Sequence, residues 1–251
     1  MTAPILPGAE PFSFSGGPIG VLCAHGFTGN SSSMRPLGEG LAAAGFTVEG
    51  PLWPGHGTSV EDMLPTRWSD WSSAADAAYR ELAGRCDKVI VAGLSMGGTL
   101  TCWLATQHPE IAGIVCVNPA VRPEPEMLEM VQGMVKEGND TMPALGNDVA
   151  DPDQTEIAYE ATPLAPLVSL LEAVAELDLA KITCPVLLCN SPNDHVVDPG
   201  NGDYLAEKAT GPVERVTLER SYHVATQDYD KDLIIERTIA FARRVTGDTA
   251  E

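Results

Sequence analysis

The pentapeptide Gly93-Leu-Ser-Met-Gly97 constrains the fold of this chain more than any other segment, because of what flanks it. Residues 88–92, Lys-Val-Ile-Val-Ala, are short, apolar and β-branched, as expected of a buried parallel strand. Residues 98–108 can form a helix that ends before Pro109. A strand, a sharp turn and a helix in this order place Ser95 in a strained turn, with its hydroxyl above the edge of a sheet. We therefore predict an α/β fold that presents a nucleophilic serine.

Glycine is abundant here, with 24 among 251 residues, so the pentapeptide alone also fits a Gly/Ser-rich loop. In the strained turn, both Gly93 and Gly97 lie where a Cβ would collide with the neighbouring strand or helix. The strand pattern before the pentapeptide and the helix pattern after it favour the turn.

A serine hydroxyl is a weak nucleophile at neutral pH, so the prediction requires a histidine base and a carboxylate that orients it. In this architecture the three residues follow in the order serine, acid, histidine, with each partner just after a strand. Of the five histidines, only His223 satisfies this order, because it follows the alternating stretch 213–219. The acid is expected after the apolar strand 185–190, where we assign Asp194, with Asp198 as the nearest rival.

A tetrahedral intermediate also needs two backbone N–H donors for its oxyanion, and the loss of one costs about 3–4 kcal/mol in comparable sites. One donor is expected from Met96, the residue after the nucleophile, at the N-terminus of the helix. The other is expected from the loop 25–29, which follows the apolar strand 19–24, and there we assign Phe27. We expect His25 to brace this loop rather than to act as a base.

The alternation of strand and helix patterns is regular except between residues 121 and 180. An apolar strand at 111–117 precedes this region, and the next convincing strand begins only at Pro185. Unstructured loops of such length are uncommon unless they are functional, so we expect a lid above the catalytic face. The sequence thus predicts a core at residues 1–120, a cap at 121–180 and the second part of the core at 181–251.

Composition narrows the classes of partner. A net charge of −20, from 15 basic and 35 acidic residues, disfavours nucleic acids and anionic membrane surfaces and suits a neutral ester better. The six cysteines lie mostly in predicted strands and helices, without metal-site spacing, so we expect no disulfide, no metal and no cofactor. The opening residues lack a signal-peptide pattern, and no stretch has the length of a membrane span, so a cytoplasmic protein is expected. We also expect a monomer or homodimer.

Several motifs together resemble the bacterial monoacylglycerol lipase and carboxylesterase branch of the α/β-hydrolases. The resemblance extends from Gly8 to the last helix, and its most specific segments are His25-Gly-Phe-Thr-Gly29, Pro54-Gly-His-Gly-Thr58, Gly93-Leu-Ser-Met-Gly-Gly98, Asp194-His-Val-Val197 and Ser221-Tyr-His-Val-Ala-Thr226.

This resemblance implies an α/β-hydrolase fold with a small cap and a catalytic triad of Ser95, Asp194 and His223. It also implies Phe27 and Met96 as oxyanion donors, and monoacylglycerols or short-chain esters as substrates. A generalist short-chain carboxylesterase is the main alternative. A non-catalytic ligand-binding protein of the same fold is a more distant one, because such a protein usually lacks a triad member and all three are present here.

Within the predicted cap, the segment from Asp151 to Glu160 resembles the family segment whose glutamate hydrogen-bonds the glycerol hydroxyls of a monoacylglycerol, and Glu156 matches that position. A carboxylate that accepts from two hydroxyls favours a monoester of glycerol over a diester or triester, which lacks one or both donors. The same acidic stretch also fits a solvated helix face. Five leucines are candidates for binding the acyl chain: Leu145, Leu164, Leu167, Leu170 and Leu171. A transient membrane contact through the cap is compatible with the sequence.

Overall fold

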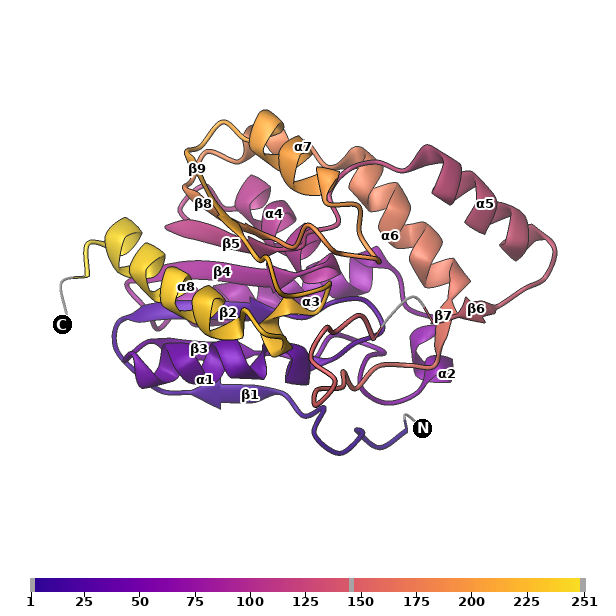
Figure 1. Ribbon diagram of the computed structural model, residues 1–251, viewed down its shortest axis with the longest axis horizontal. Helices are drawn as coiled ribbons and strands as arrows, with labels where there is room; N and C mark the ends of the chain where they lie inside the picture. The colour runs from indigo at the N-terminus through magenta and orange to yellow at the C-terminus, as the bar shows by residue number, and fades with distance from the viewer. Residues whose placement is uncertain (1–2, 145–146, 249–251) are drawn as a thin grey trace.

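A seven-stranded sheet forms the centre of the molecule, which a computed structural model describes at residues 3–144 and 147–248 (Figure 1). The strand order is β1-β3-β2-β4-β5-β8-β9, and every neighbouring pair is parallel except β1 with β3. The strands are β1 (Phe12–Phe14), β2 (Ile19–Ala24), β3 (Thr47–Gly50), β4 (Lys88–Leu94), β5 (Gly113–Val117), β8 (Val186–Asn190) and β9 (Val213–Thr217). The predicted α/β architecture with a mostly parallel sheet is confirmed.

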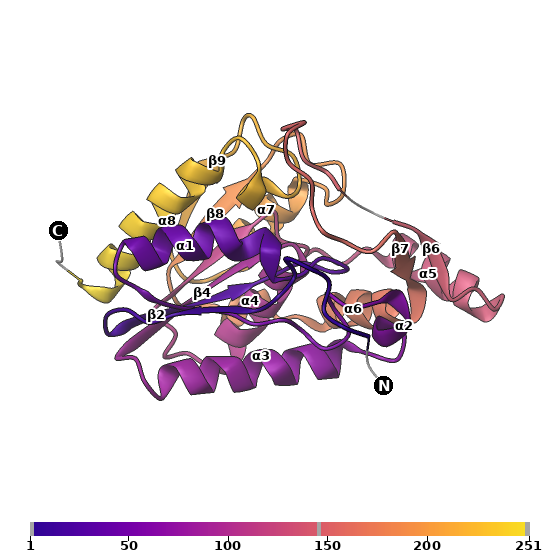
Figure 2. The same ribbon diagram turned by 90° about the horizontal axis from the view of Figure 1, so that it is seen from below.

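Helices cover both faces of this sheet (Figure 2). On one face, α1 (Arg35–Ala43) packs against α8 (Lys231–Thr246). On the other face, α3 (Trp68–Ala83) packs against α4 (Met96–Gln107), and both helices contact β2 and β4. Other helical segments of the core are η1 (Ser31–Met34), α2 (Val60–Met63), η2 (Leu179–Lys181), α7 (Gly200–Lys208) and η3 (Ala225–Gln227). In the part of the chain that the structure describes, no helix has both the length and the apolar character of a membrane span.

The central strands are apolar on both sides because both sides are covered. Along β4, Val89 and Val91 belong to the core beneath α3 and α4, whereas Ile90 and Ala92 belong to the core beneath α1 and α8. Successive side chains of a strand point to opposite faces, so one strand supplies both cores. This explains why the sequence of β4 is a continuous apolar run rather than an alternating one.

The strand β8 lies directly beside β5, so the long segment between them leaves the sheet and returns to it. We call residues 121–180 the insertion. It contains α5 (Pro125–Lys136), the antiparallel pair β6 (Thr141–Pro143) and β7 (Ala161–Pro163), and α6 (Leu164–Glu176). Figure 2 shows α5 and β6 extending away from the sheet. A small apolar cluster, separate from the two main cores, joins α5 to α6.

The structure differs from the sequence prediction at several boundaries. The helix after the pentapeptide begins at Met96 rather than at residue 98, because Ser95 itself occupies the position before the first helical residue. The three-residue strands β1, β6 and β7 were not predicted, since three residues are too short to show a period of two. The strand β2 has the predicted bounds.

Candidate active site

Ser95 occupies a strained turn between β4 and α4, with φ 58° and ψ −120°. A Cβ built on Gly93 would collide with the carbonyl oxygen of Gly97, and a Cβ built on Gly97 would collide with that of Ala24. Both glycines therefore have the steric role that the sequence predicted. The turn is tied to the end of β5, because the N–H of Ser95 donates to the carbonyl oxygen of Val117 at 3.1 Å.

Residues with strained backbone conformations lie close to this turn. Among the described residues, the non-glycine residues with positive φ are Thr28, Ser95 and Asn118, at 62°, 58° and 42°. They follow β2, β4 and β5, which are neighbours in the sheet, so the three lie in loops at the same edge. Strained residues persist only where the surrounding structure holds them, and they cluster at functional sites. This edge is therefore the candidate site on backbone geometry alone.

His223 and Asp194 meet at this edge. The ring Nδ1 of His223 lies 2.7 Å from Oδ2 of Asp194, and their side chains are 8% and 2% exposed. The other oxygen of Asp194 accepts the N–H groups of Val196 and Val197 at 2.9 and 2.8 Å. With Nδ1 donating to the carboxylate, Nε2 carries the lone pair, as a general base requires. Asp198, the rival acid, is 54% exposed and pairs with Arg122 instead.

The loop that carries His223 is held by a buried polar network from the core. Asn118 donates through Nδ2 to the carbonyl oxygens of His223 at 2.8 Å and Tyr222 at 3.2 Å. The hydroxyl of Ser191 also donates to Tyr222, at 2.8 Å. Both Asn118 and Ser191 are buried, so these bonds are shielded from competing water.

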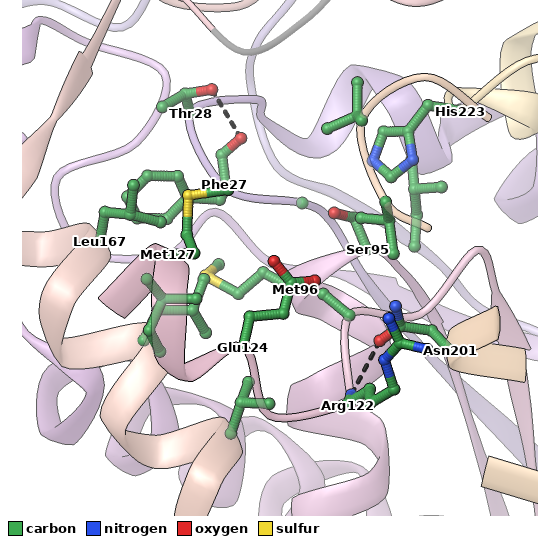
Figure 3. A pocket seen from close by; sticks show the side chains of 18 of the residues that line it. Phe27, Thr28, Ser95, Met96, Arg122, Glu124, Met127, Leu167, Asn201 and His223 are labelled. Carbon is green, nitrogen blue, oxygen red and sulfur yellow. Dashed lines mark hydrogen bonds between the residues drawn. The ribbon is translucent and has the colours of Figure 1, made fainter. Parts of the chain in front are cut away.

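The loop after β2 passes close to the serine. A Cβ on Gly26 would lie 3.3 Å from the Cβ of Ser95. Among the described residues, no acceptor is found for the backbone N–H of Phe27 or of Met96, the two expected oxyanion donors. Both residues line the same cavity as Ser95 (Figure 3).

His25, the first residue of this loop, and His56 are fully buried. The Nε2 of His25 accepts the N–H of Trp53 at 3.2 Å, and its Nδ1 donates to the carbonyl oxygen of Gly26 at 2.9 Å. Desolvation holds the pKa of His25 well below its ordinary value and lowers the pKa of His56 to about 4. Both rings are therefore neutral at physiological pH, which fits the predicted bracing role of His25.

Ser95, His223, Phe27 and Met96 line one cavity of about 110 Å³. This volume is several times the roughly 10–15 Å³ that one water molecule needs. Figure 3 shows Phe27, Met127 and Leu167 at one end, and Ser95 and His223 toward the other. The apolar lining from the insertion comprises Met127, Leu167, Leu170, Leu171 and Val174. Of the five candidate leucines, Leu167, Leu170 and Leu171 line the cavity. Leu164 instead packs in the cluster between α5 and α6, and Leu145 lies outside the described residues.

Glu156 also lines the cavity and is not part of a helix, so the solvated-helix interpretation is wrong. Its backbone N–H donates to Oδ1 of Asn147 at 3.0 Å. No hydrogen bond or ion pair to its carboxyl is found among the described residues. Desolvation raises the pKa of Glu156 to about 7, and the nearby His223 acts in the opposite direction. The carboxyl is thus an unpartnered polar group that faces the cavity.

The described residues hold no group of three or more His, Cys, Asp or Glu side chains arranged to bind a metal ion. All six cysteines are free, and burial raises the pKa of the Cys23 and Cys189 thiols to about 12. These two thiols are therefore protonated at neutral pH and behave as small apolar groups.

Sequence reasoning missed several polar residues of this site. Asn118, Asp148, Arg122 and Asn201 lie in it or support it, yet none belongs to a recognisable local motif. Asn201, for example, accepts the N–H groups of Val121 and Arg122, both at 2.8 Å, from 80 and 79 residues away. Asn118 alone carries a signal, since it is a polar residue directly after a buried strand.

Comparison with known proteins places these features in a family. The chain matches the model of the Alpha/beta hydrolase family over residues 21–237. It is 45% identical to the thermostable monoacylglycerol lipase of Bacillus sp. (strain H-257), across 97% of this chain and 98% of that protein. It is 28% identical to the carboxylesterase of Bacillus subtilis (strain 168), across 94% and 97%. A solved structure described under the metagenome-derived lipolytic enzymes LipS and LipT covers 96% of this chain and 100% of its own, with 43% identity and a TM-score of 0.92.

Proposed function

The chain belongs to the alpha/beta hydrolase family, and from that premise we propose that it is a serine esterase that cleaves monoacylglycerols into glycerol and a fatty acid. The observation that carries the proposal is the single cavity lined by Ser95, His223 and Glu156, with Asp194 hydrogen-bonded to His223 behind it. The relative with 45% identity is named a monoacylglycerol lipase, which supports the same substrate class.

In the proposed mechanism, Nε2 of His223 accepts the proton of the Ser95 hydroxyl while the oxygen attacks the ester carbonyl. Asp194 holds Nδ1 and stabilises the imidazolium that forms. The N–H groups of Phe27 and Met96 stabilise the oxyanion of the tetrahedral intermediate. His223 then donates the proton to the departing alcohol, which leaves an acyl group on Ser95. A water molecule activated by His223 releases the fatty acid. No cofactor takes part.

We assign the insertion as a cap over the core segments 1–120 and 181–251. Its helices α5 and α6 supply Met127, Leu167 and Leu170 to the apolar end of the cavity. An acyl chain gains about 0.8 kcal/mol for each methylene that it buries against such a wall. The acyl chain therefore lies at this end, and its length determines how much binding free energy it gains.

Glu156 is the group that selects the alcohol portion. Its carboxyl lines the cavity and has no partner among the described residues, so it is available to accept from two hydroxyls of a glyceryl ester. A monoacylglycerol brings both donors, whereas a simple alkyl ester brings none and leaves a buried polar group unpartnered. The proposal therefore assigns preference for a monoglyceride over a diglyceride to this residue.

A generalist short-chain carboxylesterase is the second candidate. The carboxylesterase of Bacillus subtilis that matches 94% of this chain supports it. The two candidates share the triad and the oxyanion donors, and they differ in how the cap treats the alcohol. A non-catalytic ligand-binding role is disfavoured by the simultaneous presence of Ser95, Asp194 and His223 at one edge of the sheet.

Three further predictions accompany the proposal: a cytoplasmic location, a monomeric or homodimeric state, and transient contact of the cap with membranes. The exposed Met130 on α5 supports the contact with membranes. The net charge of −20 limits such contact to surfaces that are not strongly anionic.

The test compares hydrolysis of 1-monolauroylglycerol, dilauroylglycerol and p-nitrophenyl butyrate by the wild-type protein. Ser95→Ala is the control, and it should abolish turnover of all three. Strong preference for the monoglyceride supports the first candidate. Efficient turnover of p-nitrophenyl butyrate with little monoglyceride activity supports the second.

Glu156→Gln sharpens this test because it keeps the shape of the side chain and removes its charge. It should lower kcat/KM for the monoglyceride while sparing p-nitrophenyl butyrate. An equal loss on both substrates would contradict the role of Glu156 in glycerol recognition. Serine-independent turnover, or no turnover of any of the three, would contradict the esterase proposal itself.

A further inference from the structure

Asp148, at the end of the insertion nearest to the histidine loop, touches both loops that carry the proposed acid and base. Its Oδ2 accepts the backbone N–H of His195 at 3.0 Å and that of His223 at 3.1 Å. Its Oδ1 lies 2.8 Å from Nδ1 of His195. The side chain is 14% exposed, and no other acceptor for these two N–H groups is found among the described residues. His195 directly follows Asp194, so one carboxylate joins the two loops.

A second carboxylate makes the reverse connection, from the core to the insertion. Asp228 is fully buried and accepts the N–H groups of Ala150 at 2.7 Å and Asp151 at 3.0 Å, both in the insertion. It also accepts the N–H groups of Tyr222 and Tyr229 in its own region. Hydrogen bonds to a carboxylate are stronger than those between neutral groups. This part of the insertion is therefore fixed to the histidine loop in both directions.

The same segment is fixed at its other end to the loops on the nucleophile side. The N–H of Tyr159 donates to the carbonyl oxygen of Thr28 at 3.2 Å. The hydroxyl of Tyr159 accepts the N–H of Thr58 at 2.9 Å and donates to the carbonyl oxygen of Gly55 at 2.7 Å. We call residues 147–159 the strap. Glu156 lies on the strap between these two attachments.

The peptide of His223 is consequently held on both of its polar sides. Asn118 of the core donates to its carbonyl oxygen, and Asp148 of the strap accepts its N–H. The hold from the core does not depend on the insertion, whereas the hold from Asp148 exists only when the strap is in place. The imidazole moves with its backbone, so the position of the strap affects the position of the base.

We propose that Asp148 is a positioning residue, which fixes the peptide of His223 relative to Asp194 and so makes the alignment of the base depend on the seated strap. The inference rests on the proposed triad. The Asp148 carboxylate does not contact the reacting atoms, and the inference assigns its effect to the backbone N–H groups of His195 and His223. A displacement of about 1 Å caused by a change outside the reacting groups can lower a rate by roughly 100-fold. We expect a loss of that order when the carboxylate is removed.

The experiment compares Asp148→Ala with Asp148→Asn, using p-nitrophenyl butyrate because this small ester has no glyceryl group for Glu156. Asparagine keeps one oxygen that can accept both N–H groups, so it should retain kcat within about fivefold. Alanine removes the acceptor, and kcat should fall by about 100-fold with KM within about twofold of wild type. Asp151→Ala is the matched control, and it should leave kcat within about twofold. In the part of the chain that the structure describes, the carboxyl of Asp151 accepts only the N–H of Asp153, within the strap.

His195→Ala separates the ring contact of Asp148 from its two backbone contacts, because it removes the ring and keeps the backbone N–H. It should leave kcat within about threefold. A loss equal to that of Asp148→Ala would overturn the inference, since the contact with the His195 ring rather than the backbone contacts would then be responsible.

Titration of the reactive serine with a fluorophosphonate, together with circular dichroism, gives the fraction of folded, competent enzyme in each variant. The inference requires the loss in Asp148→Ala to persist per titrated site and to be rescued in Asp148→Asn. A normal kcat per titrated site in Asp148→Ala, or an equal loss in both variants, would overturn it. Turnover that survives in Ser95→Ala would instead overturn the proposed function, so the two failures are distinguishable.

Discussion

The two sides of the cavity hold their reactive groups by different physical means. On the nucleophile side, Ser95 is positioned by local sterics, in a turn where Gly93 and Gly97 leave no space for a Cβ. The turn is shaped by the two adjoining elements, β4 and α4, together with the neighbouring ends of β2 and β5. The pentapeptide and the strand and helix patterns that flank it are therefore enough to predict it.

On the base side, His223 is positioned by hydrogen bonds from distant parts of the chain. Asn118, Asp148 and Asp194 hold its carbonyl oxygen, its N–H and its ring, across separations of 105, 75 and 29 residues. This arrangement exists only after the sheet and the insertion have assembled. The nucleophile side should therefore respond to steric changes, and the base side to the loss of single hydrogen-bond acceptors.

The largest expected effect is a loss of kcat on replacement of Asp194, the proposed acid on the base side. Asp194→Asn should lower kcat by about 10⁴-fold, because the amide no longer holds the required tautomer of His223 or stabilises the imidazolium. The side chain keeps an oxygen for the N–H groups of Val196 and Val197, so the melting temperature should change little. Asp198→Asn is the matched control, since Asp198 is exposed and pairs with Arg122. Steady-state kinetics that show the larger loss in Asp198→Asn would reverse the assignment of the acid.

The next largest expected effect is a loss of stability when one methyl group is added on the nucleophile side. Gly97→Ala places a Cβ against the carbonyl oxygen of Ala24, where the backbone cannot yield easily. We expect a loss of about 3 kcal/mol in the free energy of unfolding, or roughly 6–12 °C in Tm. Gly133→Ala is the control, because nothing lies within 4 Å of a Cβ at that position on α5. It should stabilise the protein by about 0.5–1 kcal/mol. Similar Tm values for both variants would contradict the steric account.

The same contrast explains what the sequence could predict. The longer apolar strands of the core and the bounds of β2 followed from runs of apolar residues, since each run is local. Chain order identified His223 and Asp194, which the structure brings within 2.7 Å. Asp148 could not be identified, because its partners are two backbone N–H groups that no side chain in the sequence reveals.

The cavity end of the site was predictable only in part. Leu167 and Leu170 line the cavity and Leu164 does not, although all three occur in one apolar helix. Which face of α6 meets the cavity depends on how α5 packs against it, and that packing is not encoded in the hydrophobic pattern of α6 alone. The short pair β6 and β7 likewise forms by pairing across 17 residues rather than by local propensity.

A smaller effect is the loss of stability at acidic pH, which arises from two buried histidines on the nucleophile side. Burial lowers the pKa of His25 and His56 below the unfolded value of about 6.5, so their contribution to stability is present above pH 6.5 and is lost as the pH falls. Glu156 opposes this trend, because its pKa is raised to about 7, and its contribution is present below about pH 4.5 and lost as the pH rises through 7. Between pH 6.5 and 5, the free energy of unfolding should therefore fall by about 2 kcal/mol in total.

Urea unfolding at several pH values measures this loss. The free energy of unfolding should change more steeply with pH in Glu156→Gln, because this variant removes the opposing contribution. It should change less steeply in His56→Asn. A free energy of unfolding that stays flat from pH 6.5 to 5 in all three proteins would show that the buried histidines do not respond as their surroundings require.

The smallest expected effect is a change of substrate preference with pH, which we assign to Glu156. Because desolvation raises its pKa to about 7, the carboxyl is mostly protonated at pH 6 and mostly ionised at pH 8. Only the ionised form accepts from both glycerol hydroxyls without offering a proton of its own. The ratio of kcat/KM for 1-monolauroylglycerol to that for p-nitrophenyl butyrate should therefore rise from pH 6 to 8, by less than about tenfold, the change in the ionised fraction. Taking the ratio cancels any pH dependence that the two substrates share. Glu156→Gln should make the ratio independent of pH, and a ratio that still rises in this variant would place the titrating group elsewhere in the cavity.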